Sequence, residues 1–279
     1  MAGSTNCGPL TGGCAAGEGG IDTSTDRKTI TDLPKRPGDN GTPAPAGYKG
    51  PRYEYATTTA CALSDPGGVG AQSLCTRAIT ACTDPARGLG PLTRIWRRTV
   101  QGGQPPSGWT LLGVTCWADA VPGGTPRPTM ADILKAFHTT PWSEPQITTQ
   151  PVGNTTLVGL PAYYQVNWTP DGYEPGETDT LTLLGYQVQI RPRLDHFTYV
   201  FGDGETFGPT TETGGVYPTG TITHPYLAPG SYGSRVDTTF AADFRVNGGQ
   251  WAPIPDTVTV AGPTTTVTVR TATNHLVAH

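Results

Sequence analysis

The strongest indication of the fold class is a pattern that begins near residue 146. From there on, short stretches alternate apolar and polar residues. Residues 161–168, 179–184 and 186–190 alternate with a period of two, which is typical of β-strands that bury one face. Gly and Pro, at 38 and 28 residues, punctuate these stretches, and a charged fraction of only 14% disfavours long exposed helices. About eight or nine short strands at regular spacing predict a mainly β protein with a C-terminal β-sandwich.

A three-part motif lies within this strand-rich region. Residues 199–205 read Tyr-Val-Phe-Gly-Asp-Gly-Glu, and His224-Pro-Tyr226 and Gly230-Ser-Tyr232 follow. Glycine on both sides of Asp203 permits a positive φ, and the Asp side chain can accept bonds from backbone amides across the turn. These motifs, in this order, resemble the PKD domain, an immunoglobulin-like β-sandwich of secreted and cell-surface bacterial proteins. The resemblance covers roughly a third of the chain.

The resemblance has two departures and one implication for individual residues. Tyr199 stands where the family usually has Trp, and residues 205–223 form a longer connection, rich in Thr and Gly. In PKD-like domains the matching Asp and His stabilise the fold. The resemblance therefore implies a structural role for four polar or aromatic residues, Asp203, His224, Tyr226 and Tyr232.

All six cysteines precede residue 117, and none forms a Cys-x-x-Cys pair: Cys7, Cys14, Cys61, Cys75, Cys82 and Cys116. The five histidines all lie after the last cysteine, which disfavours a zinc site. An even number of cysteines in a Gly- and Pro-rich chain predicts three structural disulfides with fifteen connectivities open. Because disulfides persist in oxidising compartments, we expect a secreted or cell-surface protein.

Targeting signals and net charge limit the possible locations and partners of the protein. Residues 1–5 have neither the basic head nor the apolar run of a signal peptide, which we take to have been removed. No stretch approaches the roughly 18 apolar residues that a membrane span requires. The net charge of −4 gives no support for a nucleic-acid partner. Arginine greatly outnumbers lysine, a bias typical of GC-rich, actinobacterial-looking genomes.

Composition, periodicity and the PKD resemblance together predict four segments: a flexible N-terminal segment (residues 1–50), a cysteine-rich disulfide-stapled unit (51–127), a connecting helix (128–144) and a PKD-like β-sandwich (145–279). The first segment is polar, rich in Gly and Pro and without periodicity, so it cannot bury enough apolar surface to offset its ordering entropy. Cys7 and Cys14 form either a local bridge or a bridge to the next segment. In the helix, Thr129 is a suitable N-cap, with Asp132 at the position of a capping box.

One stretch clusters basic and aromatic side chains, and it supplies four candidate binding residues: Arg94, Trp96, Arg97 and Arg98. Such a cluster could stack on a sugar or bind an acidic partner. We favour the simpler interpretation, an amphipathic element with Trp96 packed inward and the arginines in solvent. If the unit binds carbohydrate instead, Trp96, Trp109 and Trp117 would form a stacking face.

The polar residues of the three-part motif include the types found in a hydrolytic triad. Asp203, His224 and Ser231 are candidates, yet Ser231 lacks the Gly-x-Ser-x-Gly turn that presents a nucleophile. The sequence also lacks a phosphate-binding Gly-x-x-x-x-Gly-Lys-Ser/Thr loop and a His-Glu-x-x-His zinc motif. We therefore interpret Asp203 and His224 as structural and predict no catalytic residue and no cofactor.

Four carboxylates gather between two predicted strands: Asp171, Glu174, Glu177 and Asp179. They could hold calcium, which prefers several oxygen ligands. Their spacing is not that of an Asp-x-Asp-x-Asp-Gly loop, so we favour a solvated acidic turn over a metal site.

These observations predict a non-enzymatic secreted or cell-surface protein that acts in adhesion, assembly or protein–protein contact, as PKD-like modules and spacers do. A carbohydrate- or cell-wall-binding accessory module is the alternative, and an unrecognised secreted enzyme is the second alternative. The partner would be a protein or a cell-surface glycan. Exposed coplanar tryptophans favour glycan binding, whereas a concave site with a convergent acid and base favours an enzyme.

Overall fold

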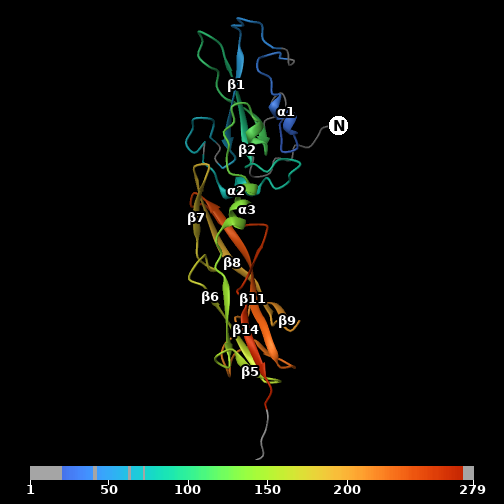
Figure 1. Ribbon diagram of the computed structural model, residues 1–279. Coiled ribbons are helices and arrows are strands. Elements are labelled where there is room, and N and C mark those ends of the chain that lie inside the picture. The colour runs from blue at the N-terminus through green and yellow to red at the C-terminus, as the bar shows by residue number, and fades with distance from the viewer. Residues whose placement is uncertain (1–20, 40–42, 62–63, 72, 273–279) are drawn as a thin grey trace, which may run out of the picture. The chain divides into compact units, whose positions relative to one another are not determined.

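The contacts within the chain define two units (Figure 1). A computed structural model describes residues 21–39, 43–61, 64–71 and 73–272. Unit 1 contains the chain up to Ala136, together with Thr180–Gln189 and Phe244–Ala252. Unit 2 contains Phe137–Asp179, Ile190–Asp243 and the residues from Pro253 onward.

These units differ from the predicted ranges 51–127, 128–144 and 145–279. Two long strands, β8 (Tyr186–Val200) and β11 (Gly230–Val246), contribute residues to both units. Alternation identifies a strand, but it carries no information about which unit each end of a long strand contacts.

Unit 1 is built on a three-stranded antiparallel sheet of order β1-β2-β3, with strands β1 (Arg52–Thr59), β2 (Thr93–Val100) and β3 (Thr110–Thr115). The Gly- and Pro-rich stretch 101–109 joins β2 to β3. The remaining elements are short: α1 (Arg27–Thr31), α2 (Thr76–Thr80), the 3₁₀ turn η1 (Ala118–Ala120) and most of α3 (Met130–Thr139).

The segment expected to be flexible is partly packed. Ile21, Ile30 and Leu33 are buried together with Ile95 and Val121. The backbone N–H of Tyr53 donates to the Lys35 carbonyl oxygen (2.8 Å), which ties this segment to β1. The expectation of a free tether therefore does not hold for residues 21–35, because three well-spaced apolar side chains supply a buried face that overall composition concealed.

Helix α3 begins as its sequence predicts. The Thr129 Oγ1 accepts from the Asp132 amide (3.2 Å), and an Asp132 Oδ2 accepts from the Thr129 amide (2.9 Å). This reciprocal pair is a capping box with Asp in the place of Glu. Met130, Ile133 and Phe137 are buried on one face of the helix.

Most of a β-sandwich lies in unit 2, while its parts at Thr180–Gln189 and Phe244–Ala252 belong to unit 1. One sheet has the order β10-β6-β4, and the other has the order β5-β14-β11-β8-β7. Three further strands pair with members of the larger sheet: β9 with β8, and β12 and β13 with β11. The remaining strand bounds are β4 (Pro145–Gln150), β5 (Thr155–Leu157), β6 (Pro161–Trp168), β7 (Asp179–Leu183), β9 (Thr206–Thr210), β10 (Thr223–Pro225), β12 (Ala252–Pro253), β13 (Val258–Ala261) and β14 (Thr265–Arg270).

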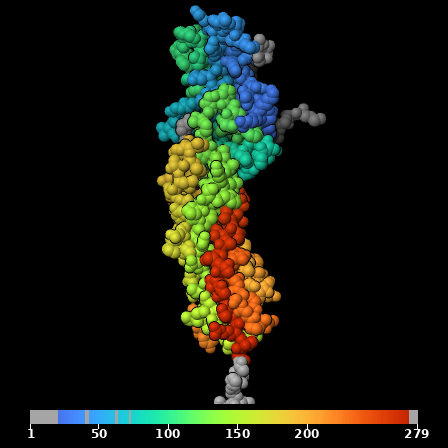
Figure 2. All heavy atoms as spheres, viewed as in Figure 1, coloured from blue at the N-terminus to red at the C-terminus, as the bar shows by residue number. Residues whose placement is uncertain are grey.

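The core of the sandwich lies between these two sheets. Tyr164 and Val166 of β6 pack in one apolar cluster with Phe197 and Tyr199 of β8 and Val267 of β14. Figure 2 shows the red C-terminal strand beside green chain, in agreement with the parallel pairing of β14 with β5. The structure thus confirms the predicted fold class, a mainly β protein with a C-terminal sandwich, a small disulfide-braced unit and one short helix before the sandwich.

Candidate binding surface

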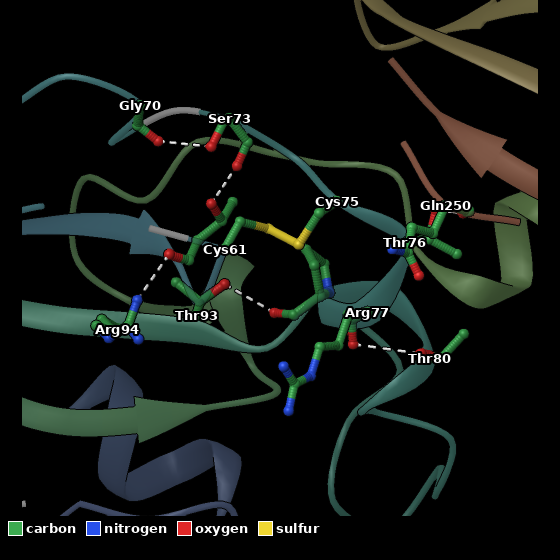
Figure 3. The surroundings of a disulfide bond; sticks show 12 residues. Cys61, Gly70, Ser73, Cys75, Thr76, Arg77, Thr80, Thr93, Arg94 and Gln250 are labelled. Atoms are coloured by element: carbon green, nitrogen blue, oxygen red, sulfur yellow. Dashed lines mark hydrogen bonds between the residues drawn. A yellow bond between two sulfur atoms is a disulfide. The ribbon is translucent and has the colours of Figure 1, made fainter. Parts of the chain in front are cut away.

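Two disulfides brace unit 1 around α2, and Figure 3 shows one of them, Cys61–Cys75. Cys61, just after β1, is bonded to Cys75, the N-cap of α2. Cys82, just after α2, is bonded to Cys116, which follows β3. Both flanks of α2 are therefore fixed to strand ends, as expected for a small unit that depends on covalent staples. Cys7 and Cys14 lie outside the described residues.

One face of the β1-β2-β3 sheet carries what we call the aromatic–arginine face, formed by Glu54, Trp96, Arg98 and Trp109. Residues two apart on a strand share a face, so Trp96 and Arg98 point to the same side of β2. Glu54 pairs with Arg98 across β1, and the pairing of Arg97 with Thr110 places Trp109 opposite Arg98. Two of the three tryptophans proposed for a stacking face thus come together.

Arg98 organises this face. Its guanidinium carbon lies 4.4 Å from the centroid of the Trp109 ring, and its Nε donates to the Glu54 Oε2 (2.7 Å). The Trp96 Nε1 donates to the Thr58 Oγ1 (2.8 Å). Both tryptophans remain half-buried. The side chains are held by specific partners before any ligand arrives, which lowers the entropic cost of binding.

The other two candidate arginines do not contribute to the exposed face, because Arg94 is buried and Arg97 points to the other side of the sheet. Arg94 is only 3% exposed and donates from Nη1 to the Thr59 carbonyl oxygen (3.1 Å), and burial lowers the pKa of its guanidinium. It supports the strand end beside the Cys61–Cys75 disulfide (Figure 3). Arg97 points to the opposite face of the sheet, where its guanidinium carbon lies 4.3 Å from the centroid of the Tyr53 ring.

Trp117, the third tryptophan, is not part of the aromatic–arginine face. It packs against the apolar cluster around Ile30 and Ile95, with the Arg27 guanidinium 5.2 Å from its ring centroid. Arg27 is held in turn by Asp119 (Nη2–Oδ2 2.7 Å). Trp117 therefore has a packing role in unit 1.

A second concave surface, which we call the tyrosine groove, runs beside the start of β1. It consists of two cavities of about 1420 Å³ and about 670 Å³. The two cavities share four lining residues, Tyr48, Arg52, Tyr53 and Glu54. Arg52 donates from Nη2 to the Tyr48 carbonyl oxygen (3.2 Å), and the rings of Tyr53 and Tyr55 meet edge to face at 6.5 Å.

Sequence reasoning did not single out this groove. The stretch Tyr53-Glu-Tyr55 predicts a strand, and its alternation places both rings on one side of that strand. This alternation was the one pattern in the sequence that could have indicated the groove. Tyr48 and Arg52 carried none, because the loop conformation that brings them beside β1 has no periodic pattern.

In unit 2, the residues of the three-part motif form one closed network. The His224 Nε2 lies 2.6 Å from the Asp203 Oδ2, and the Asp203 Oδ1 accepts from the Glu205 amide (3.1 Å). The His224 ring stacks on Phe201 with a centroid distance of 4.1 Å. Ser231 is exposed on β11 and makes no described contact with this pair.

Tyr226 is the centre of the buried part of this network. Its hydroxyl lies 2.7 Å from the Tyr164 hydroxyl and 2.8 Å from the Ser234 Oγ, and it donates to the Phe201 carbonyl oxygen (2.9 Å). Its ring stacks on Tyr232 at 4.5 Å. Burial raises the pKa of both Tyr164 and Tyr226, so both stay protonated and serve as hydrogen-bond donors.

Two of the four carboxylates of the acidic turn accept hydrogen bonds, each from a different donor. The Glu177 Oε2 accepts from the Glu174 amide (2.9 Å), and the Asp179 Oδ2 accepts from the Thr140 Oγ1 (3.2 Å). The Asp171 carbonyl, rather than its carboxylate, accepts from the Thr169 Oγ1 (3.2 Å). Within the part of the chain that the structure describes, no three His, Cys, Asp or Glu side chains gather as metal ligands would.

No protein-family model matches the chain, and no curated protein matches it. Among the described residues, no helix is long and apolar enough to cross a membrane. The functional argument therefore rests on the geometry above.

Proposed function

We propose that this chain is a non-enzymatic secreted or cell-surface protein that acts in adhesion, assembly or protein–protein contact, and that the aromatic–arginine face of unit 1 is its contact surface. The observation that carries this proposal is the arrangement of Trp96, Arg98 and Trp109 on one half-exposed sheet face. Trp and Arg are the residue types most enriched at the energetic centres of protein interfaces.

The state of Arg98 supports a role in binding. Its ring contact with Trp109 and its bond to Glu54 hold the guanidinium in one orientation. A positioned guanidinium offers directed donors for a carboxylate or carbonyl of a partner. An exposed ion pair such as Arg98–Glu54 adds little stability by itself, so folding alone does not explain why these three side chains are arranged in this way.

In this proposal, unit 2 is a PKD-like module that supports or spaces unit 1. The polar residues of its motif satisfy one another, with Asp203 bonded to His224 and Tyr226 bonded to Ser234. That closure favours a structural role over catalysis. An extracellular location is supported by the two disulfides, which persist in oxidising compartments.

Affinity capture with matched variants tests the contact surface. We expect immobilised full-length protein to capture a specific partner from culture fluid or cell envelopes of the source organism. The double variant W96A/W109A should lose it. The control is Trp251→Ala, because Trp251 also lies under an arginine, with the Arg245 guanidinium 4.5 Å from its ring. Equal capture by all three proteins would contradict the assignment.

Glycan binding is the second candidate, because Trp96 and Trp109 lie on the same face. A sugar ring could then stack on the exposed part of either indole ring. Treating the captured material with protease or with glycosidase separates the two candidates: loss of retention after protease treatment supports protein contact, and loss after glycosidase treatment supports the accessory-module alternative.

A further inference from the structure

The tyrosine groove has a lining that is aromatic as well as charged, which sets it apart from an ordinary surface depression. Tyr48 and Tyr53 line both of its cavities, and Tyr55 lines the larger one. The Arg36 guanidinium lies 5.4 Å from the Tyr48 ring centroid, and Arg97 covers Tyr53. The two cavities adjoin through their shared lining residues, and the larger one alone, at about 1420 Å³, exceeds the roughly 300–1,000 Å³ of a small-molecule site, so the groove suits a segment of a polymer.

The charges along the groove do not cancel. Its three carboxylates each have a cationic partner, in the pairs Asp32–Lys28, Asp39–Arg36 and Glu54–Arg98. Three cations also line the groove without forming an ion pair within the described part of the chain: Lys35, Lys49 and Arg52. Of these, Arg52 is the best placed, because it lines both cavities and its bond to the Tyr48 carbonyl holds it at their junction.

We propose that the tyrosine groove binds an anionic polysaccharide whose sugar rings carry carboxylate groups. The apolar C–H face of each ring would pack on Tyr48 or Tyr53, as aromatic side chains accept flat apolar surfaces while their hydroxyl groups remain hydrogen-bonded. The ring carboxylates would meet Arg52 and Lys35, since a guanidinium binds carboxylate through two parallel bonds.

The tyrosines and the Glu54 carboxylate favour a sugar over an acidic peptide. Glu54 lines the groove at an exposed position, and its carboxylate, which accepts from Arg98 through Oε2, can also accept hydrogen bonds from hydroxyl groups. A polysaccharide with hydroxyl groups, carboxylates and flat C–H faces suits Glu54, the cations and the tyrosines together. A poly-acidic peptide brings a similar charge, but it has no flat C–H ring face for Tyr48 and Tyr53 and supplies no hydroxyl donors. This site uses other residues than the contact surface proposed above, apart from Glu54 at their border, and does not rest on that proposal.

The probe for this site is polygalacturonate, a linear polymer of a carboxylated sugar, titrated into the intact, oxidised protein by calorimetry. We expect saturable binding that weakens as salt rises. Tyr53→Ala should lower the affinity by about tenfold or more, and Tyr53→Phe should restore most of it. Arg52→Gln should lower the affinity and reduce the salt dependence. Arg87→Gln is the matched control, because Arg87 is an exposed arginine of the same unit outside the groove.

Three results would overturn the proposal. The first is that polygalacturonate does not bind. The second is that poly-L-glutamate binds equally well, which would mean charge attraction alone, and the third is that neutral dextran binds equally well, which would mean stacking alone. If Tyr53→Ala fails to fold, as judged by its thermal unfolding, Arg52→Gln carries the test, since its side chain is exposed. Because W96A/W109A leaves the groove residues in place, it should still bind polygalacturonate, so the failure of one site can be told from the failure of the other.

Discussion

Two effects act in opposite directions on the pKa of Asp203. Burial of its carboxyl group pushes the pKa up, but the hydrogen bonds from His224 and from the Glu205 amide outweigh burial, and the pKa lies below its ordinary value. The carboxylate is only 18% exposed, so these bonds are made largely away from solvent. The residue therefore fixes the Gly-Asp-Gly turn to the His224 side of the sandwich.

Replacing Asp203 with Asn should lower the free energy of unfolding of unit 2 by about 1–3 kcal/mol, because the change removes a charged acceptor from a largely buried bond. Urea denaturation at pH 7 measures this directly. Asp195→Asn is the control, since Asp195 also pairs with a histidine, His196, but at an exposed position where an ion pair adds little. Equal effects of the two substitutions would contradict the bracing role.

The same group predicts how stability depends on pH. Because the folded pKa of Asp203 is depressed, its charged form contributes stability that is fully present above the unfolded pKa of about 3.9. That contribution is lost as the pH falls from there through the folded pKa. Denaturation measured between pH 7 and pH 2 should show a smaller loss at the acid end for Asp203→Asn than for the unchanged protein. Parallel curves would argue against the lowered pKa.

At the scale of elements, Ile21, which leads into the buried segment 21–35, lies at the β3 edge of the β1-β2-β3 sheet. Ile21 bridges Gly113 of β3 in parallel, and the Val114 amide donates to the Ile21 carbonyl oxygen (3.2 Å). A Cβ on Gly113 would lie 1.8 Å from that carbonyl oxygen. Only glycine allows this approach, and the approach carries the chain from Ile21 into the core.

Gly113→Ala should therefore detach this segment and destabilise unit 1 by about 1–3 kcal/mol, the usual cost of an overpacked contact. Limited proteolysis should then cut between Ile21 and Leu33 faster than in the unchanged protein. Gly102→Ala serves as the control, because a Cβ there meets no atom within 4 Å. Cleavage at the same rate in all three proteins would be inconsistent with this docking.

The strands and the capping box of α3 could be predicted because their signals are local. Alternation locates β6, and Thr129 with Asp132 locates the start of α3. The packing of Ile21 and Ile30 could not be predicted, because it depends on a glycine in a strand more than 80 residues away. The pairing of Cys61 with Cys75 was equally out of reach, because sequence spacing alone leaves every connectivity open.

At the scale of the whole molecule, the two units are stabilised by different means. The described part of unit 1 has small apolar clusters and two disulfides, whereas unit 2 has a continuous core between two sheets and contains no cysteine. Small units with limited cores usually depend on covalent staples, and larger ones do not. The contact surface and the tyrosine groove both lie in the unit that depends on its disulfides.

Reductant should consequently separate the two units in a thermal unfolding experiment on the intact protein. We expect dithiothreitol to lower the unfolding temperature of unit 1 and to leave a cooperative transition for unit 2. Circular dichroism measures the transitions, and hydrogen exchange assigns each one to a unit. The unreduced protein is the control. Loss of both transitions together under reducing conditions would mean that unit 2 depends on the disulfides as well.

The candidate site illustrates the limit of sequence analysis at this scale. The cluster at residues 94–98 marks the correct strand, but only the register separates buried Arg94 and outward Arg98 from Arg97 on the other face. A bulge between Ile95 and Trp96 helps to set that register, and no residue type in the stretch predicts the bulge. The tyrosine groove needs a loop conformation that has no sequence period.

Hydroxyl-radical footprinting tests most directly whether binding occurs through the aromatic–arginine face. The intact protein is footprinted alone and with the cell-envelope material that it captures. We predict that oxidation of Trp96 and Trp109 falls several-fold in the complex, while oxidation of Trp251, elsewhere in unit 1, and of exposed Leu227 in unit 2 stays unchanged. Protection confined to unit 2, or capture without protection of Trp96 and Trp109, would contradict the claim.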